Sequence, residues 1–313
     1  MFLFDSLIKP ILTYGSEVWA VSEAGTSQVD KIFLKHIKYS LGVKSTTSTI
    51  MVLGECGQYP PSISCKISLL SYLNRLENLS DDHLAKIMYC ELKNMHNLGF
   101  NTWITNAFKI VKLYDVDVSL NITDFKSLCS ARVKEHFVRN WQNELSNIVS
   151  NPILRTYNTF KMSFSCEPYL ISVKDYKYRN AITRLRTSSH DLAIETGRHQ
   201  KPKIIVQDRL CRICNVVEDE CHFVTRCKLF SFRRNQLYDK IRSIFPGFQD
   251  MEDNDRFIFL MSNKDNAVNT WFGKYVYSSF MRRRNFLINF SFCNDLKKLH
   301  RYQSAVLFFY DIV

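Results

Sequence analysis

Glycine and proline are scarce in this chain, which has 9 glycines and 7 prolines among 313 residues. Few positions therefore break regular secondary structure, and apolar residues recur at helical spacing through most of the sequence. We predict a mainly α-helical fold with few strands. The sequence also has no low-complexity tract and no internal repeat. Because 46% of its residues are apolar and 13% aromatic, it has enough material to bury a core, which argues against global disorder.

Long apolar runs are missing as well. No stretch approaches the roughly 18 apolar residues of a membrane span, so we expect no membrane partner. The apolar start of the chain lacks a basic segment and is interrupted by Asp5, Lys9 and Pro10, which does not fit a secretory signal peptide. We therefore expect an intracellular, soluble protein of the nucleus, the cytoplasm or both.

Acidic residues are outnumbered, with 30 Asp and Glu against 42 Lys and Arg. This balance favours an acidic partner, such as nucleic acid or an anionic membrane surface, over a neutral ligand. Ten cysteines are present, but they are scattered through a long chain with one tight cluster. That distribution fits reduced thiols and a metal site better than a disulfide framework.

Two stretches near the start of the chain have a clear helical period. The first runs from Gln28 to Gly42, which we expect to end the helix, and its apolar face is made of Val29, Ile32, Phe33, Ile37 and Leu41. Its opposite face carries Lys31, Lys35 and Lys38, either as a solvated surface or as a nucleic-acid contact. The second follows a turn-rich break at 54–61, ends near Asn78, and presents Ile63, Ile67, Leu70, Leu73 and Leu76.

Further elements are predicted from capping residues and breaks. Ser80 fits the N-cap of a helix starting at Asp81. Residues 162–166 are a candidate short strand, and 246–250 a loop. The remaining helices are predicted at 103–114, 124–150, 175–190, 228–244 and 255–285.

One cluster of cysteine and histidine has metal-ligand spacing. Cys211, Cys214, His222 and Cys227 form a Cys-x2-Cys-x7-His-x4-Cys pattern, and such a set suits one tetrahedral Zn²⁺. Four protein ligands leave no open position for water, so the predicted zinc is structural rather than catalytic. Cys221 is an alternative to His222 as the fourth ligand. A group of buried free thiols is the alternative to any metal site.

Positive charge is concentrated around this cluster. Residues 170–234 contain 14 Lys or Arg and 7 Asp or Glu. Tyr176 and Tyr178 alternate with several cations, a mixture that can neutralise phosphates and stack on bases, although a solvated helix face is the plainer interpretation. A short basic run at 281–285 suits a phosphate contact or a nuclear-import signal. The candidate nucleic-acid residues of this region are Lys174, Lys177, Arg179, Arg184 and Arg186.

Two parts of the sequence resemble the carboxyl-terminal region of reverse transcriptases from non-LTR (LINE-type) retrotransposons. The segments at 3–19, 33–43 and 54–60, with LFDSLIKPILTYGSEVW, FLKHIKYSLGV and GECGQYP, resemble the helical thumb of those enzymes. The segments at 178–198 and 210–227, with YRNAITRLRTSSHDLAIETGR and LCRICNVVEDECHFVTRC, resemble the region of their terminal zinc knuckle.

The resemblance implies four parts: a thumb-like part at 1–62, a helical connector at 63–168, a basic helix with the zinc knuckle at 169–240 and a helical tail at 241–313. It also implies a noncatalytic fragment that binds RNA or DNA and associates with a full-length retroelement polymerase. A polymerase palm would need paired aspartates for Mg²⁺, and the one Asp-Asp pair, Asp81–Asp82, is explained by helix capping.

Two other functions are open at this point. The first is a zinc-dependent protein-interaction module, although such modules usually have eight ligands for two metals. The second is an enzyme that uses His190 and Glu195 or the neighbouring serines, Ser188 and Ser189. Since no convergent base, metal or oxyanion element accompanies these residues, we expect no catalytic activity and expect their segment to pack against the knuckle.

Overall fold

The computed structural model describes residues 3–120 and 123–310, with side chains up to residue 289. In this part of the chain the fold is mainly α-helical, as predicted. Extended pairing between the described residues amounts to two isolated bridges, Cys56 with Cys166 and Leu210 with Val217. The chain divides into two compact units, Met1–Glu167 and Pro168–Val313. None of the described helices has the length and apolar character needed to cross a membrane.

The N-terminal unit is a helical assembly built around one central helix. Its elements are η1 (Phe4–Ile8), α1 (Lys9–Leu12), α2 (Ser16–Trp19), α3 (Glu23–Leu41), α4 (Thr49–Cys56), α5 (Pro61–Glu77), α6 (Leu84–Asn97), α7 (Trp103–Tyr114), α8 (Phe125–Ser146), η2 (Pro152–Leu154) and α9 (Tyr157–Phe160).

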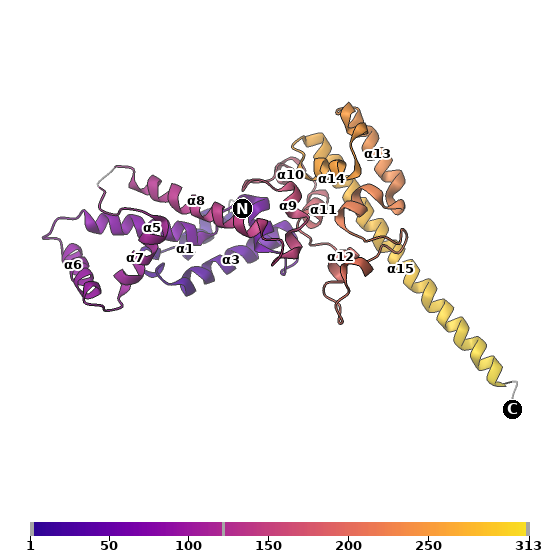
Figure 1. Cartoon of the computed structure of the whole chain (residues 1–313), viewed down its shortest axis with the longest axis horizontal. Helices are drawn as coiled ribbons and strands as arrows, with labels where there is room; N and C mark the ends of the chain where they lie inside the picture. The colour runs from indigo at the N-terminus through magenta and orange to yellow at the C-terminus, as the bar shows by residue number, and fades with distance from the viewer. Residues whose placement is uncertain (1–2, 121–122, 311–313) are drawn as a thin grey trace. The chain divides into compact units, whose positions relative to one another are not determined.

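Helix α5 is the centre of this unit and contacts α2, α3, α6, α7 and α8 (Figure 1). It can do so because it is apolar on two faces. Ile63, Ile67 and Leu70 pack against α8 and the end of α7. Leu69 and Leu73, on another side, pack against α6 and α7. The predicted stripe of α5 is therefore confirmed, and Asn78 ends this helix as expected. The predicted boundary at residue 62 falls inside α5.

The first predicted helix is also confirmed, except that it begins five residues earlier, at Glu23, and that one of its apolar residues is exposed. Gly42 ends α3 in the left-handed conformation at φ 65°. Four of the five expected apolar residues are buried, but Ile32 is 48% exposed. Its position lies at the edge of the stripe, where side chains at helical spacing rotate out of the core.

Three local predictions in this unit are wrong. Helix α6 begins at Leu84 with His83 as its N-cap, because Ser80 instead accepts a turn hydrogen bond from the His83 amide. The break predicted at 54–61 covers only 57–60, since α4 continues through Cys56. Residues 162–166 bend rather than form a strand, which packs Phe164 against the rings of Tyr59, Phe137 and Trp141.

The C-terminal unit combines helices with a segment of short turns. Its elements are α10 (Tyr169–Ser172), α11 (Tyr176–Arg186), α12 (Ala193–Thr196), η3 (Val206–Asp208), η4 (His222–Arg226), η5 (Lys228–Phe230), α13 (Ser231–Arg242), η6 (Pro246–Asp250), α14 (Asp253–Ser262) and α15 (Asn266–Tyr310).

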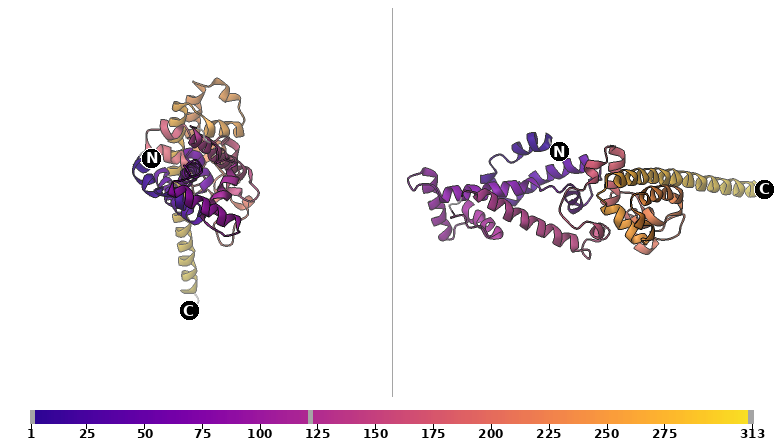
Figure 2. Two further views of the ribbon diagram at one scale, coloured as in Figure 1. Left: turned by 90° about the vertical axis from the view of Figure 1, so that its left-hand side faces the viewer. Right: turned by 90° about the horizontal axis from the view of Figure 1, so that it is seen from above.

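Helix α15 is the longest helix of this unit and packs on α10, α11 and α13 (Figure 2). Gly273 permits its close approach to α11, because a Cβ atom there would lie 3.0 Å from Cβ of Tyr178. The single helix predicted at 255–285 is two helices. Asp265 separates them by accepting hydrogen bonds from the amides of Ala267 and Val268, as an N-terminal cap does.

The other helix ends differ modestly from the predictions. Helix α7 matches 103–114, whereas α8 ends at Ser146 and α11 at Arg186, short of the predicted 150 and 190. Residues 246–250, predicted as a loop, form the short helical turn η6. The predicted boundary at residue 240 lies inside α13, whereas the one at 168 coincides with the division between the units.

Candidate metal centre

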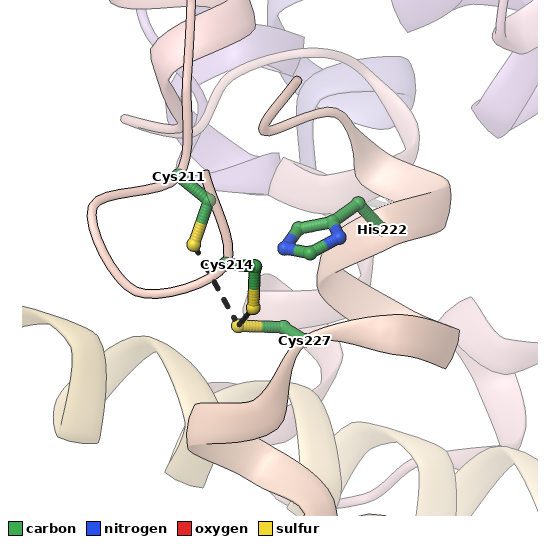
Figure 3. A group of neighbouring side chains, drawn as sticks. All are labelled: Cys211, Cys214, His222 and Cys227. Atoms are coloured by element: carbon green, nitrogen blue, oxygen red, sulfur yellow. Dashed lines mark hydrogen bonds between the residues drawn. The ribbon is translucent and has the colours of Figure 1, made fainter. Parts of the chain in front are cut away.

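The first two cysteines lie on a tight backbone turn. The Cys211 amide donates to the Val216 carbonyl at 2.7 Å, and the Asn215 amide donates to the Cys211 carbonyl at 2.9 Å. Asn215 has φ 55°, a left-handed conformation that asparagine tolerates better than most residues. This turn holds the Cys211 and Cys214 side chains on the same side of the loop (Figure 3).

The other two residues lie at the two ends of η4. This element is a π-turn, in which the Cys227 amide donates to the His222 carbonyl at 2.8 Å. The wider turn brings two residues five apart in sequence onto one face. The Tyr275 hydroxyl of α15 is 2.9 Å from the Val224 carbonyl, so α15 supports the turn from behind.

The four side chains converge as the spacing predicts. One ligand atom from each of Cys211, Cys214, His222 and Cys227 lies within 4.8 Å of all the others. Sγ of Cys227 is 3.9 Å from Sγ of Cys211 and 4.0 Å from Sγ of Cys214. A tetrahedral site with Zn–S bonds of about 2.3 Å requires S–S separations of about 3.8 Å, so the observed spacing suits one metal ion.

The surroundings of the donor atoms also favour a metal. Both ring nitrogens of His222 are buried and make no hydrogen bond. Burying a polar nitrogen without a hydrogen bond costs free energy, and a bound metal would give one of the two nitrogens a partner. The Lys228 amide donates to Sγ of Cys214 at 3.4 Å, a contact that favours a thiolate. In the metal-free protein, a hydrogen bond from Cys227 lowers the pKa of Cys211 and raises the pKa of Cys227.

Cys221, the alternative to His222, lies outside the group. Its Sγ is 3.3 Å from Oδ1 of Asn254 and 3.6 Å from Oγ1 of Thr225. Burial raises the pKa of this thiol, which disfavours the thiolate that binds metals. The geometry therefore favours His222 as the fourth residue.

The segment before the cluster packs against it, as expected for residues 188–198. His190 is buried and its Nε2 lies 3.1 Å from Oε1 of Glu220, while its Nδ1 accepts from the Leu192 amide at 3.3 Å. Because Nδ1 is an acceptor, Nε2 carries the proton and donates to Glu220. This arrangement explains His190 as a structural residue, because it bonds to Glu220, two positions before His222.

A second buried carboxylate ties the segment to α15. Arg283 donates two hydrogen bonds of 2.7 and 2.6 Å to the Glu218 carboxylate, which also accepts from the Ala193 amide at 2.7 Å. Part of the basic run at 281–285 is therefore internal. Sequence spacing could not reveal this pair, because its members are 65 positions apart.

Most of the residues predicted to bind nucleic acid in and beside α11 instead bond to other groups of the protein. Arg186 is 2% exposed and stacks over the Tyr169 ring, so its prediction as a surface contact is wrong. Arg179 donates to the Val173 carbonyl, and Arg184 pairs with Asp191 at 3.6 Å. Lys174 and Lys177 are exposed, and Lys177 lies 3.9 Å from Asp175.

The α3 lysines divide in the same way. Lys31 and Lys35 are exposed. Nζ of Lys38 instead donates to the Ser45 carbonyl at 2.7 Å, which ties the end of α3 to the following loop. Two of these three lysines thus present a free cationic surface.

Sequence reasoning missed the exposed cations at 228–240, which follow Cys227, although the basic run that it noted at 281–285 includes Arg282. Lys228, Arg233 and Lys240 surround the start and one face of α13, and Arg282 lies on α15. The run FRRNQLYDK directly after the cluster was the available signal, but it has no aromatic alternation like that of 174–179.

No family model, curated protein or solved structure matches this chain. The candidate centre therefore depends on its own geometry: three cysteines and one histidine, gathered at metal-binding distance by a turn and a π-turn.

Proposed function

We propose that Cys211, Cys214, His222 and Cys227 hold one structural Zn²⁺ in a noncatalytic nucleic-acid-binding protein. Soft thiolate and imidazole donors in a closed set of four are the ligands that zinc prefers in structural sites. The sulfur separations and the unpartnered His222 ring support this assignment. Bound zinc would act as a cross-link of the local fold, since four protein ligands fill its coordination shell.

The observation that supports nucleic-acid binding is the segregation of charge. The C-terminal unit contains 25 Lys and Arg and 15 Asp and Glu, a net charge of +10 out of +12 for the chain. Three of its carboxylates, Glu195, Glu218 and Glu220, are buried. Buried cations balance these carboxylates, because Arg186 and Arg209 are buried and Arg283 pairs with Glu218. The surface of the unit therefore keeps its positive charge, which favours a polyanion.

The origin of the chain is part of the proposal. The zinc-knuckle pattern and the thumb-like segments support a carboxyl-terminal fragment of a LINE-type reverse transcriptase. In that role the protein would bind RNA or DNA in the nucleus or cytoplasm and would associate with a complete polymerase. It would not itself catalyse polymerisation.

Zinc content and binding to oligonucleotides test this proposal on the full chain. We expect one zinc per chain and binding to a labelled 20-nucleotide oligouridylate at 50 mM salt. If about five phosphates are neutralised, affinity should fall by about two orders of magnitude at 200 mM salt. Absence of binding at 50 mM salt with zinc present would refute nucleic-acid binding, and two zinc ions per chain would favour a protein-interaction module.

A further inference from the structure

Three adjacent hollows lie along the junction of α13 and α15 in the C-terminal unit. Their volumes are about 360, 470 and 630 Å³, within the range of small-molecule sites. Arg233 lines all three, so they adjoin one another, and we call them together the α13–α15 groove. The α13 side of the groove is Arg233, Gln236 and Lys240, residues three or four apart that share one helix face, and Leu229 of η5 precedes them.

The charge of the α13–α15 groove has one sign. Five cations line it, and no carboxylate does so among the described residues. The hollow beside the metal cluster differs, because Asp191, Asp208 and Glu218 contribute to its wall. The groove is thus better suited to an extended anion than that hollow is. Its cations are Lys228, Arg233, Lys240, Lys274 and Arg282.

Most of these cations are available to a ligand. Lys228, Arg233, Lys240 and Arg282 are exposed, and none forms an ion pair or side-chain hydrogen bond within the described part of the chain. On α11, by contrast, the arginines bond to Val173, Ser189 and Asp191. Free guanidinium and ammonium groups can contact phosphates without first breaking an internal pair.

Aromatic rings accompany the cations. Phe232 is 75% exposed at the rim near the metal cluster, where burial would otherwise be favourable. Tyr277 lines two of the hollows, and Trp271 lines the end near Lys240. Rings spaced along a cationic groove are the arrangement that holds single-stranded nucleic acid, because unpaired bases can stack while phosphates meet the cations.

The start of α13 is tied to the metal cluster. The Lys228 amide contacts Sγ of Cys214 at 3.4 Å, and Nη1 of Arg234 donates to the Cys227 carbonyl at 2.9 Å. Arg233 and Phe232 lie beside these contacts on the same helix. The cluster therefore fixes the position of the groove's first turn.

We propose that the α13–α15 groove is the binding site for a single-stranded polynucleotide, and this assignment rests on the proposed nucleic-acid function. Lys228, Arg233 and Arg282 contact consecutive phosphates, and Phe232 stacks on an unpaired base. The duplex is the poorer ligand, because its bases are already stacked and cannot reach the ring.

Charge reversal in the groove is the first test. In the zinc-loaded full chain, Arg233→Glu with Arg282→Glu should weaken binding to a 20-nucleotide oligouridylate or oligothymidylate at least tenfold at 50 mM salt. The slope of log affinity against log salt should fall by about 1.4, because two phosphate contacts are lost. Lys203→Glu with Lys264→Glu is the matched control, since both lysines are exposed, lie outside the groove and give the same change in net charge.

The ring contact is tested separately. Phe232→Ala should weaken single-strand binding about fivefold or more and leave duplex binding unchanged. Phe100→Ala, at a ring 57% exposed in the N-terminal unit, should change neither. Circular dichroism and zinc content establish that each variant is folded. Both alanine variants remove exposed side chains, so folding should be preserved.

The outcomes separate this inference from the proposed function. If the unmodified chain binds no oligonucleotide, the proposed function fails. If it binds but the groove reversal matches its control, only the groove assignment is wrong. Equal binding to duplex together with an unaffected Phe232→Ala variant would overturn the single-strand assignment, and so would polyglutamate competing as well as the oligonucleotide at equal charge. Stronger binding of oligouridylate than oligothymidylate, with both lost on reversal, would identify RNA as the ligand.

Discussion

The neighbouring residues Cys221 and His222 allow a direct test of the metal centre. His222→Ala removes a ring whose two nitrogens are buried without partners, whereas Cys221→Ser changes a side chain directed to Asn254 and Thr225. We expect the histidine variant to lose at least 100-fold in zinc affinity, since even groups that only support a ligand are worth 10–100-fold. Cys221→Ser should keep one zinc per chain with unchanged affinity.

The effect on stability follows from what η4 buries. Phe223, Val224 and Phe230 are each at most 2% exposed, and complete burial of such side chains contributes about 1.5–3 kcal/mol apiece. If the turn opens when no metal is bound, this burial is lost and the folded unit is destabilised by roughly 5 kcal/mol or more. In a unit of this size that corresponds to a fall of about 10–20 °C in the melting temperature of the C-terminal unit. Cys221→Ser should shift it by less than about 3 °C.

Zinc content by mass spectrometry and thermal unfolding with and without a chelator measure both quantities. Chelation should lower the melting temperature of the unmodified chain and of Cys221→Ser, and should have little further effect on His222→Ala. The reasoning fails if Cys221→Ser loses the metal while His222→Ala keeps it. It also fails if chelation changes neither the unfolding curve nor near-ultraviolet circular dichroism of the unmodified chain.

Substitutions at three sites, the Arg283–Glu218 pair, Gly57 and Asp30, test the packing within each unit by urea unfolding. Arg283→Met leaves the nearly buried Glu218 carboxylate unpaired and should cost about 3 kcal/mol, most of which Glu218→Gln in the same chain should restore. Gly57→Ala should cost about 2 kcal/mol or more, because Gly57 has φ 59° and a Cβ would lie 2.3 Å from the Cys166 amide nitrogen. Burial raises the pKa of Asp30, so its folded form binds protons more readily and stability falls as pH rises through that pKa. Asp30→Asn should abolish this dependence, whereas Asp30→Ala should cost about 1–3 kcal/mol at neutral pH, because the Ser62 amide loses its acceptor.

The sequence predicted well wherever a local rule decides the structure. The α5 stripe and the Gly42 end of α3 depend on helical spacing and on a left-handed residue, and both are confirmed. The candidate metal-binding group depends on ligand spacing, and the turn and the π-turn bring the four side chains together. The ambiguity between Cys221 and His222 required side-chain directions, which adjacent sequence positions do not specify.

The local predictions that are wrong concern residues whose conformation depends on side chains distant in the sequence. Residues 162–166 alternate as a strand would, but Phe164 bends them toward rings from other elements. Gly54 continues α4, where the Trp141 and Tyr157 side chains leave no space for a Cβ. Arg186 belongs to a basic run, yet it is buried beside Tyr169. The number of cations in a segment can be counted from the sequence. Which of them are available to a ligand depends on the hydrogen-bond acceptors that the folded protein places beside them.

The candidate metal centre determines where the cations and rings of the α13–α15 groove lie. From residue 197 to 230 the described chain has no helical element longer than five residues, so few backbone hydrogen bonds hold the segment that precedes α13. A metal cross-link between Cys214 and Cys227 would supply the missing constraint, and both residues also bond to the start of α13. Loss of zinc should then release Arg233 and Phe232 from their places beside α15 while leaving the net charge of the unit almost unchanged. Nonspecific attraction of a polyanion would persist in the chelated protein, but the preference for single strands over duplex would disappear, because that preference requires the ring and the cations at fixed positions.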